Sequence, residues 1–392
     1  MKRYVSTLFL IATLFFVLFP TDTGASKTWT SFSNVSIDKE WKISFSKAID
    51  ENSTANNVYI TKGTTKLPVQ IEINGTVLQV KPKELLDYNT SYTVVVNENV
   101  QDRTGKRIKN AIIIPFTTEK KSSYITKARE TFSSEYEMNW YLTDYNYHNF
   151  HLKGFTNSKE VGLFDTRKNY TFKGIQIGKD TISSVKKKYG QPIKSIPKGN
   201  TLYLQSYKDK YGQETHGTYV INEQYVTFFY DVHQNNIVRS IYSVTKDIEA
   251  TKPGFYRKDV SIAYRNSLEQ MMAHLINESR VAAGLKPLTY TPTYNEIARA
   301  HSSDMATKNY FSHTDSSGKT VLKRAVIGGL DFKYIGENIA KGQYSSIFAH
   351  EALMNSIGHR QNILSKNYTH VIVGVAFNSD NLPYYTINFY SK

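Results

Sequence analysis

The spacing of apolar residues changes along this chain of 392 residues, and that change limits the possible folds more than any other feature. Between residues 28 and 120, apolar and polar residues alternate, as they do in half-buried strands. After residue 264, apolar residues recur every three or four positions, as they do in amphipathic helices. Because the two patterns bury side chains differently, and because one core rarely serves so long a chain, we predict a multidomain protein.

The first segment, residues 28–120, predicts an all-β antiparallel sandwich. Turn signals such as Asn74-Gly75 and Thr104-Gly105 separate the alternating runs, and this regular spacing is typical of sandwiches. Strands are expected at residues 41–45, 58–60, 69–73, 77–80, 92–96 and 112–116. Trp41-Lys42-Ile43-Ser44-Phe45 and Pro115-Phe116-Thr117-Thr118 resemble parts of the bacterial Ig-like domain. The resemblance implies a spacer or adhesion module.

The second segment, residues 122–262, predicts an α+β domain. A short helix is expected at residues 181–189, because Gly190 is a typical helix stop. Strands are expected at residues 218–221, 224–231 and 237–245. Gly178-Lys179-Asp180, Tyr189-Gly190-Gln191-Pro192 and the terminal hairpin resemble the domain that precedes the CAP domain in some exported bacterial proteins. His233 falls in a hairpin turn, where we expect an exposed structural histidine.

The third segment, residues 264–392, predicts helices followed by strands. Residues at helical spacing are Leu268, Met271, Met272, Leu275 and Ile276. A second helix is expected to open with Thr293 and Glu296 at capping-box spacing, and a third to span residues 345–356. The closing strands are expected at residues 371–377 and 384–389. Short helices around a small antiparallel sheet predict an α-β-α sandwich.

A series of short motifs follows in order along this third segment. They are Asn277-Glu278-Ser279-Arg280, Ala300-His301-Ser302-Ser303-Asp304-Met305, Tyr310-Phe311-Ser312-His313-Thr314, Gly336-Glu337-Asn338 and Asn355-Ser356-Ile357-Gly358-His359-Arg360. In this order they resemble the CAP superfamily (SCP domains) of cysteine-rich secretory, antigen and pathogenesis-related proteins, in its disulfide-free bacterial form. The resemblance implies the CAP fold and a shallow cavity, lined by two histidines and two acidic residues, that can hold a divalent cation.

The resemblance places His313, Glu337 and His359 at three of those four positions. Two imidazoles and one carboxylate form a first shell for zinc with open positions. The fourth position is Ser356, a poorer ligand, so the implied cofactor is at most a weakly bound divalent cation such as zinc. The alternative is that the two histidines belong to a hydrogen-bond network that holds the conformation.

Further residues are expected to line the same cleft. His301 and Asp304 are three residues apart, which places them on one face of the expected helix, where they can pair. A carboxylate beside an imidazole fixes the tautomer of the ring. The other residues expected to line the cleft are Asn338 and Ser356. A pairing of His301 with Asp304 that only satisfies a buried polar face remains the alternative to a functional role.

The N-terminal residues predict export. Lys2 and Arg3 precede an apolar run from residue 5 to 19, and Thr23-Gly24-Ala25-Ser26 follows Pro20. This order is typical of a signal peptide, and the run is shorter than the roughly twenty residues of a membrane-spanning helix. We predict removal of residues 1–25, a secreted or extracellular protein without a transmembrane span, and cell-wall association as an open alternative. An uncleaved signal anchor is the competing interpretation.

Charge and cysteine content restrict the partners and the chemistry. The 49 Lys and Arg against 34 Asp and Glu give a net charge of +15, which attracts polyanions through long-range fields. Cell-envelope polyanions, peptidoglycan and lipid are the expected partners; nucleic acid is not, because no recognised nucleic-acid module is visible. Solubility alone is the competing explanation of the charge. The chain has no cysteine, as is common in Gram-positive exported proteins, so thiol catalysis is excluded.

Two functional hypotheses follow from the residues, and a third, binding of a sterol or fatty acid, is implied by the resemblance to the CAP superfamily alone. The first is a binding or effector protein of the bacterial envelope without catalytic activity. The second is a metal-assisted, peptidase-like hydrolase, in which His313 and His359 hold a cation and Glu337 is the third ligand or the general base. The sequence contains no nucleophile elbow, phosphate loop or HExxH helix. We therefore predict the first function and leave the catalytic role of these three residues unassigned.

Overall fold

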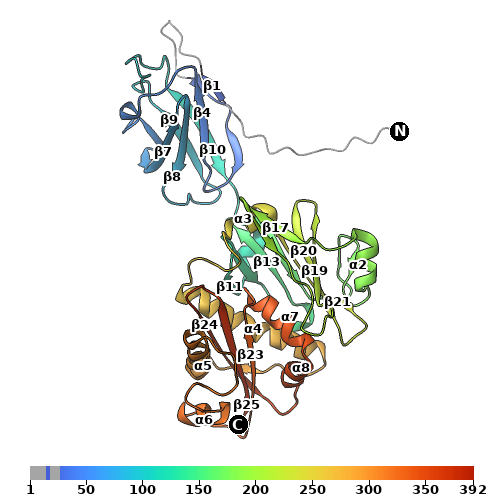
Figure 1. Ribbon diagram of the computed structural model, residues 1–392. Helices are drawn as coiled ribbons and strands as arrows, with labels where there is room; N and C mark the ends of the chain where they lie inside the picture. The colour runs from blue at the N-terminus through green and yellow to red at the C-terminus, as the bar shows by residue number, and fades with distance from the viewer. Residues whose placement is uncertain (1–14, 18–26) are drawn as a thin grey trace, which may run out of the picture. The chain divides into compact units, whose positions relative to one another are not determined.

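The computed structural model describes residues 15–17 and 27–392 as two compact units, residues 1–123 and 124–392 (Figure 1). The predicted signal peptide, residues 1–25, lies outside the described residues, except that Phe15–Val17 forms strand β1. Residues 122–262 are called the middle domain and residues 264–392 the terminal domain. The two units are described separately below.

The first unit contains a β-sandwich of two sheets, with strand orders β1-β4-β8-β7 and β2-β10-β9-β5-β6. Its strands are β1, β2 (Lys27–Thr28), β3 (Phe32–Val35), β4 (Trp41–Phe45), β5 (Val58–Lys62), β6 (Thr65–Leu67), β7 (Val69–Asn74), β8 (Val77–Pro82), β9 (Ser91–Val96) and β10 (Ile112–Thr118), with a 3-10 turn at Glu51–Ser53. Alternate residues of β10 are buried, and Phe116 packs on Trp41 with ring centroids 5.0 Å apart. The predicted sandwich is confirmed.

The middle domain is built on a seven-stranded antiparallel sheet, β11-β12-β13-β14-β21-β20-β19. Its elements are α1 (Ser123–Thr126), β11 (Glu130–Ser133), β12 (Asn139–Leu142), β13 (His151–Thr156), β14 (Lys159–Asp165), β15 (Thr171–Phe172), β16 (Ile175–Gln176), α2 (Ile182–Tyr189), β17 (Ser195–Lys198), β18 (Thr201–Leu204), β19 (His216–Ile221), β20 (Gln224–Asp231), β21 (Ile237–Thr245) and α3 (Lys246–Thr251), with a 3-10 turn at Tyr147–Asn149. Helix α2 begins after the capping box of Thr181 and Ser184 and ends at Gly190, where φ is +78°. The residues predicted as a helix and a hairpin therefore adopt those structures.

The terminal domain has a four-stranded sheet, β22-β24-β25-β23, between two layers of helices. Its elements are α4 (Ile262–Ala282), β22 (Thr289–Tyr290), a 3-10 turn (Pro292–Tyr294), α5 (Asn295–Lys308), α6 (Val321–Ile327), β23 (Tyr334–Lys341), α7 (Ser346–Asn355), α8 (Ile357–Ile363), β24 (His370–Phe377) and β25 (Pro383–Ser391). Val371, Val373 and Val375 pack in one cluster with α4 and α7. Ile372 clusters with Ala325 of α6 on the opposite face. This alternation confirms the predicted α-β-α sandwich.

Helix α5 lies unusually close to the sheet. A Cβ added to Gly374 of β24 would lie 2.1 Å from the backbone nitrogen of Arg299, so only glycine permits this approach. The predicted start of α5 is wrong: Thr293 lies in the preceding 3-10 turn, and Tyr294 stands at the N-cap without a side-chain hydrogen bond. Pro292 opens that turn, because its fixed φ suits a first helical position, and the regular helix begins only after it.

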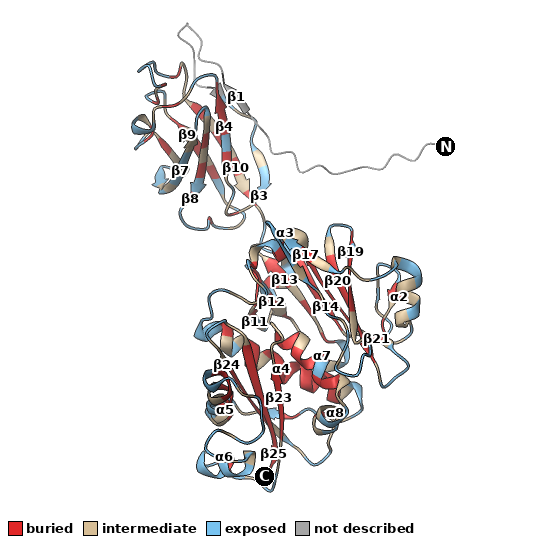
Figure 2. Ribbon diagram, viewed as in Figure 1, coloured by how far each residue is buried: buried red, intermediate tan, exposed pale blue. Residues whose placement is uncertain are grey.

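The middle and terminal domains share one hydrophobic cluster. Met271 and Leu275 of α4 and Ile347 of α7 pack with Phe229 and Tyr242 of the seven-stranded sheet. The ring of Phe348 lies 4.9 Å from that of Phe229 and 5.4 Å from that of Tyr242, centroid to centroid. Figure 2 shows α4 and α7 buried along the side that faces this sheet. The two domains therefore belong to a single folding unit.

Candidate functional site

The centre of the candidate site is a hydrogen-bonded pair, His313 and Glu337. Glu337 lies on β23 and its side chain is 2% exposed, whereas the His313 side chain, in the loop after α5, is 57% exposed. Nδ1 of His313 lies 2.9 Å from Oε1 of Glu337. An ionised carboxylate only accepts hydrogen bonds, so Nδ1 of His313 carries a proton and donates it to Glu337.

The second oxygen of Glu337 is also occupied. Arg324 of α6 donates from Nη2 to Oε2 over 2.6 Å, and Asn388 of β25 donates to the same oxygen over 2.9 Å. Arg324 also binds the backbone carbonyls of His313 and Lys319, so it ties the histidine loop to the carboxylate. Arg324 and Asn388 could not be predicted from the sequence, because neither belongs to a motif and no spacing relates them to Glu337.

Burial alone would raise the pKa of Glu337, but its partners reverse the shift. The hydrogen bond from His313 and the positive charge of Arg324 stabilise the carboxylate and lower the pKa below its ordinary value. Glu337 is therefore an anion at neutral pH. Both of its oxygens accept hydrogen bonds from protein donors, so Glu337 acts as an acceptor that orients the imidazole of His313.

Glu337→Gln is expected to lower the free energy of unfolding by about 3–5 kcal/mol at pH 7, since Arg324 loses the partner of its buried charge. A lowered carboxyl pKa in the folded state contributes stability above the unfolded pKa of about 4.3, and this contribution is lost as the pH falls through the folded value. The difference between wild type and variant should therefore shrink from pH 7 to pH 3, measured by urea unfolding. Glu296→Gln, at a side chain 79% exposed, is the control; an equal pH trend in both variants would contradict the assignment.

His359 lies on α8, next to this pair but not bonded to it. Its backbone carbonyl accepts a hydrogen bond from Asn338 over 3.0 Å, and Asn338 is itself held by Asn362 over 2.8 Å. Burial, followed by the nearby charges of His313 and Lys210, lowers the pKa of His359, so the ring is neutral at pH 7. Nδ1 of His359 is buried and finds no hydrogen-bond partner within the described part of the chain. The predicted cleft residue Asn338 thus fixes the backbone of His359.

His301 and Asp304 do not pair, which corrects the prediction from their spacing. Nε2 of His301 donates to the backbone carbonyl of Ser312 over 2.9 Å, and burial followed by the charge of Arg324 lowers its pKa. Asp304 instead accepts from Tyr310 over 2.5 Å and from Ser316 over 2.7 Å. The loop after α5 offers these donors at the outer end of the helix, and the carboxylate turns toward them.

His301 and Asp304 nevertheless line one pocket of about 490 Å³ between α5 and α6. Apolar side chains of both helices, including Ile297 and Ile327, form much of its wall. His313, Glu337 and His359 are not among its lining residues. His301 connects the pocket to the pair of His313 and Glu337, since its Nε2 lies 4.0 Å from Oε1 of Glu337. Ser356, the fourth predicted cleft residue, stands at the N-cap of α8.

The donor set does not fit a three-ligand zinc site. Within residues 15–17 and 27–392, no group of three or more His, Cys, Asp or Glu side chains is arranged to hold a metal ion. Both oxygens of Glu337 already accept hydrogen bonds, from His313 on one and from Arg324 and Asn388 on the other. A carboxylate that orients a histidine in this way is typical of the second shell around a metal site. Cation binding by His313 and His359 stays a prediction.

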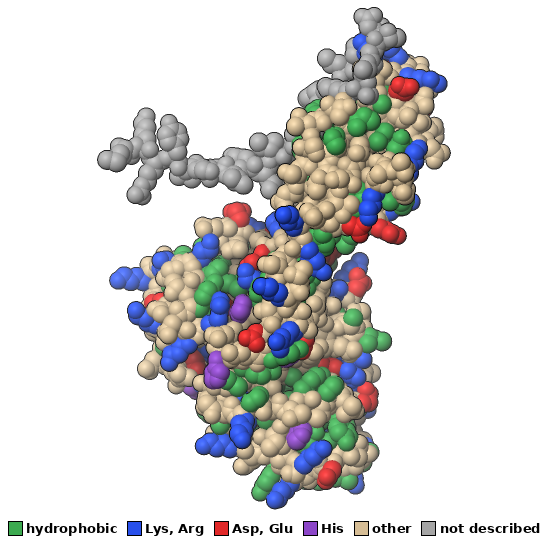
Figure 3. All heavy atoms as spheres, turned by 180° about the vertical axis from the view of Figure 1, so that it is seen from behind, with side chains coloured by type: hydrophobic (Ala, Val, Ile, Leu, Met, Phe, Trp, Pro, Cys, Tyr) green, Lys and Arg blue, Asp and Glu red, His purple; other side chains and the backbone are tan. Residues whose placement is uncertain are grey.

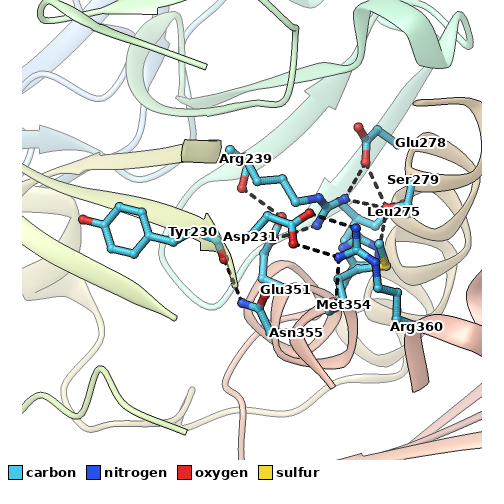
Figure 4. A network of polar contacts seen from close by, with 12 residues as sticks. Tyr230, Asp231, Arg239, Leu275, Glu278, Ser279, Glu351, Met354, Asn355 and Arg360 are labelled. Carbon is cyan, nitrogen blue, oxygen red and sulfur yellow. Dashed lines mark hydrogen bonds and ion pairs between the residues drawn. The ribbon is translucent and has the colours of Figure 1, made fainter. Parts of the chain in front are cut away.

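The predicted site is also held from the middle domain (Figure 4). Asp231, at the end of β20, forms a two-point ion pair with Arg360, the neighbour of His359, over 2.9 and 3.1 Å. Asn355 donates to the carbonyl of Tyr230 over 2.9 Å, and His233 donates to the carbonyl of Asn355 over 3.0 Å. His233 is exposed, as predicted, and its ring also contacts the terminal domain. The β20–β21 turn therefore fixes the junction of α7 and α8.

Comparison with known proteins gives family matches for three stretches of the chain. The model of the bacterial Ig-like domain matches residues 29–118, the CAP-associated N-terminal model matches residues 117–255, and the cysteine-rich secretory protein family model matches residues 273–389. With the α-β-α fold described above, these matches define a CAP-domain protein of bacterial extracellular type. The chain belongs to the cysteine-rich secretory protein family.

Relatives and solved structures agree with this membership. The chain is 31% identical over 242 residues to "Uncharacterized protein YkwD" of Bacillus subtilis, covering 55% of this chain and 90% of that protein. It is 28% identical over 325 residues to "Uncharacterized membrane protein YlbC" of the same organism, covering 78% and 90%.

Two crystal structures share the fold. One is an extracellular protein containing an SCP domain from Bacillus anthracis, with 22% identity, a TM-score of 0.58 and coverage of 68% of this chain and 89% of that one. The other is a cysteine-rich secretory protein from Staphylococcus aureus, with 17% identity, a TM-score of 0.52 and coverage of 68% and 87%. In the described part of the present chain, none of the helices combines the length and apolarity needed to cross a membrane.

Proposed function

We propose that this chain is an exported binding protein of the bacterial envelope that acts without catalysis. In this proposal the Ig-like domain (residues 28–120) is a spacer, and the terminal domain (residues 264–392) presents the binding site. The ligand contacts the exposed ring of His313, with His359 beside it. The observation that carries the proposal is that both oxygens of Glu337 accept hydrogen bonds from protein donors, His313 on one and Arg324 and Asn388 on the other, which makes the carboxylate an anchor for His313 rather than a free general base.

The charge of the chain supports a location at the envelope. A net charge of +15 attracts the anionic polymers and lipid headgroups of a cell surface. Figure 3 shows Lys and Arg side chains spread over the visible face rather than gathered in one patch. This even distribution of positive charge favours a non-specific, salt-dependent attraction to a polyanionic layer. The specific contacts are then made at a smaller site.

The metal-assisted hydrolase is the second function to be tested. The exposed imidazole of His313 and the buried, unpartnered Nδ1 of His359 favour it, because these two rings lie near one another in the described structure. It requires Glu337 to bind a water molecule or a cation in addition to its present hydrogen-bond partners.

His313→Ala is expected to reduce retention of the full chain on purified cell walls about tenfold or more at low salt, because the ligand loses a contact worth about 1.4 kcal/mol or more. His148→Ala, at an exposed histidine of the middle domain, is the matched control and should bind as wild type. Retention is measured by co-sedimentation at two salt concentrations, with supernatants assayed for released wall fragments in the presence of zinc. Negligible retention of all three proteins would overturn the binding function, and zinc-dependent release that is lost in Glu337→Ala would establish the hydrolase instead.

A further inference from the structure

The middle domain contains a second recess, on the face of its sheet that points away from the terminal domain. Helix α2 and the β15–β16 hairpin cover this face over β19, β20 and β21, where Val185 packs with Val226 and Ile241. In Figure 1, α2 lies at the end of the sheet farthest from β11 and β13. Over β13 and β14 this cover stops, and a groove of about 420 Å³ remains. We call it the sheet groove.

The strand register places a polar row on the floor of the sheet groove. Lys153 of β13 stands opposite Leu163 of β14, and Leu163 stands opposite Ser243 of β21. Gln224, at the start of β20, and His151 of β13 also line the groove. Nδ1 of His151 is fixed by the carbonyl of Asn149 at 2.9 Å. The residues of the floor therefore contribute amide, hydroxyl, ammonium and imidazole groups beside the aliphatic side chain of Leu163.

The charges of the sheet groove balance within the protein. Lys153 pairs with Glu160 over 2.7 Å. Arg167 pairs through Nε and Nη2 with both oxygens of Asp165, a fully buried carboxylate. Each of these two cations is paired with a carboxylate, so their charges cancel, although the chain as a whole has a net charge of +15. A polyanion gains little from this groove, whereas an uncharged ligand with many hydroxyl groups finds both donors and acceptors.

Two aromatic side chains line part of the sheet groove. Tyr170 and Phe172 line one side, and the guanidinium of Arg167 lies 4.5 Å from the centroid of the Tyr170 ring, which fixes that ring in place. A pyranose ring has hydroxyl groups around its edge and C–H groups on its faces, so it matches a polar floor beside a ring wall. The volume also falls within the roughly 300–1,000 Å³ of small-ligand sites. We propose that the middle domain binds an uncharged sugar unit of a glycan in the sheet groove.

The test is calorimetric titration of the full chain with three probes: a neutral trisaccharide of N-acetylglucosamine, maltotriose and inorganic phosphate. At least one neutral sugar should bind and shift the backbone amide resonances of Gln224 and Ser243, and phosphate should not. Tyr170→Ala should weaken sugar binding about fivefold to tenfold through loss of the ring contact. Tyr211→Ala, at a side chain 76% exposed outside the groove, should bind as wild type.

A second variant, Gln224→Ala, tests the proposal if Tyr170→Ala disturbs the fold. Gln224 is half-buried at the end of a strand, so its replacement is expected to leave the fold intact. Three results would each overturn the proposal. They are that no sugar binds, that phosphate binds more tightly than both sugars, and that Gln224→Ala binds sugar as tightly as wild type. The inference does not rest on the terminal-domain site: His313→Ala should leave sugar binding unchanged, so failure of one proposal is separable from failure of the other.

Discussion

Arg239→Met is expected to lower the free energy of unfolding by about 3–5 kcal/mol at pH 7, since it leaves buried carboxylates without their counter-charge. Arg239 reaches from β21 into the terminal domain, where it lies 2.8 Å from Glu351 and 3.1 Å from Glu278. The side chains of both glutamates are at most 5% exposed. Methionine keeps most of the length of the arginine stem, so the loss reports mainly on charge rather than on packing.

The pH dependence of this loss distinguishes charge from packing. Burial raises the pKa of Glu278 and of Glu351, opposed by the charge of Arg239. An acid whose folded pKa lies above its unfolded value favours the folded state as the pH falls. The cost of Arg239→Met should therefore be smaller at pH 5 than at pH 7, and Arg239→Met combined with Glu278→Gln and Glu351→Gln should recover much of it.

Urea unfolding of the full chain followed by circular dichroism measures these differences. Lys159→Met is the control, because the pair of Lys159 with Asp247 is 60% exposed on each side, and exposed pairs contribute about 0–1 kcal/mol. Equal costs for Arg239→Met and Lys159→Met, or a cost that grows as the pH falls, would show that the buried charges at the domain junction are not what stabilises it.

A terminal domain separated from the middle domain, residues 258–392, is expected not to fold cooperatively. The cut exposes Met271, Leu275 and Ile347, each at most 4% exposed in the intact unit, and burial of each such side chain contributes about 1.5–3 kcal/mol. It also removes Arg239 from Glu351 and Asp231 from Arg360. Together these losses approach the whole stability of a domain, about 5–15 kcal/mol.

Thermal unfolding of residues 258–392 and of residues 124–392 compares the two cases directly. The longer chain should give one cooperative transition, seen alike by near- and far-ultraviolet circular dichroism. The shorter chain should lack near-ultraviolet signal and bind a hydrophobic dye, as compact states without fixed packing do. A sharp transition in the shorter chain, within a few degrees of the longer one, would show that the terminal domain is autonomous and that the middle domain is an attached module.

Several predictions from residue spacing were confirmed and others were wrong, for identifiable reasons. The alternation at residues 41–45 and 112–116 predicted β4 and β10, because a strand displays its residues with a period of two whatever surrounds it. The prediction that His301 pairs with Asp304 was wrong. A shared helical face permits that contact, but the carboxylate of Asp304 accepts hydrogen bonds from donors in the following loop instead. The predicted domain boundaries and the cleft formed by His313, Glu337 and His359 stay predictions.

The sequence by itself determined the period of each element, the order of the domains and the motifs that contain His313 and Glu337, since these depend on residues close together along the chain. The tertiary structure alone decided which side chains complete the polar contacts. Arg324 reaches Glu337 across 13 positions and Arg360 reaches Asp231 across 129. Such pairings form between residues that are distant in the sequence and that tertiary packing brings into contact. A buried charge needs a partner, and the packing decides which residue is close enough to be that partner.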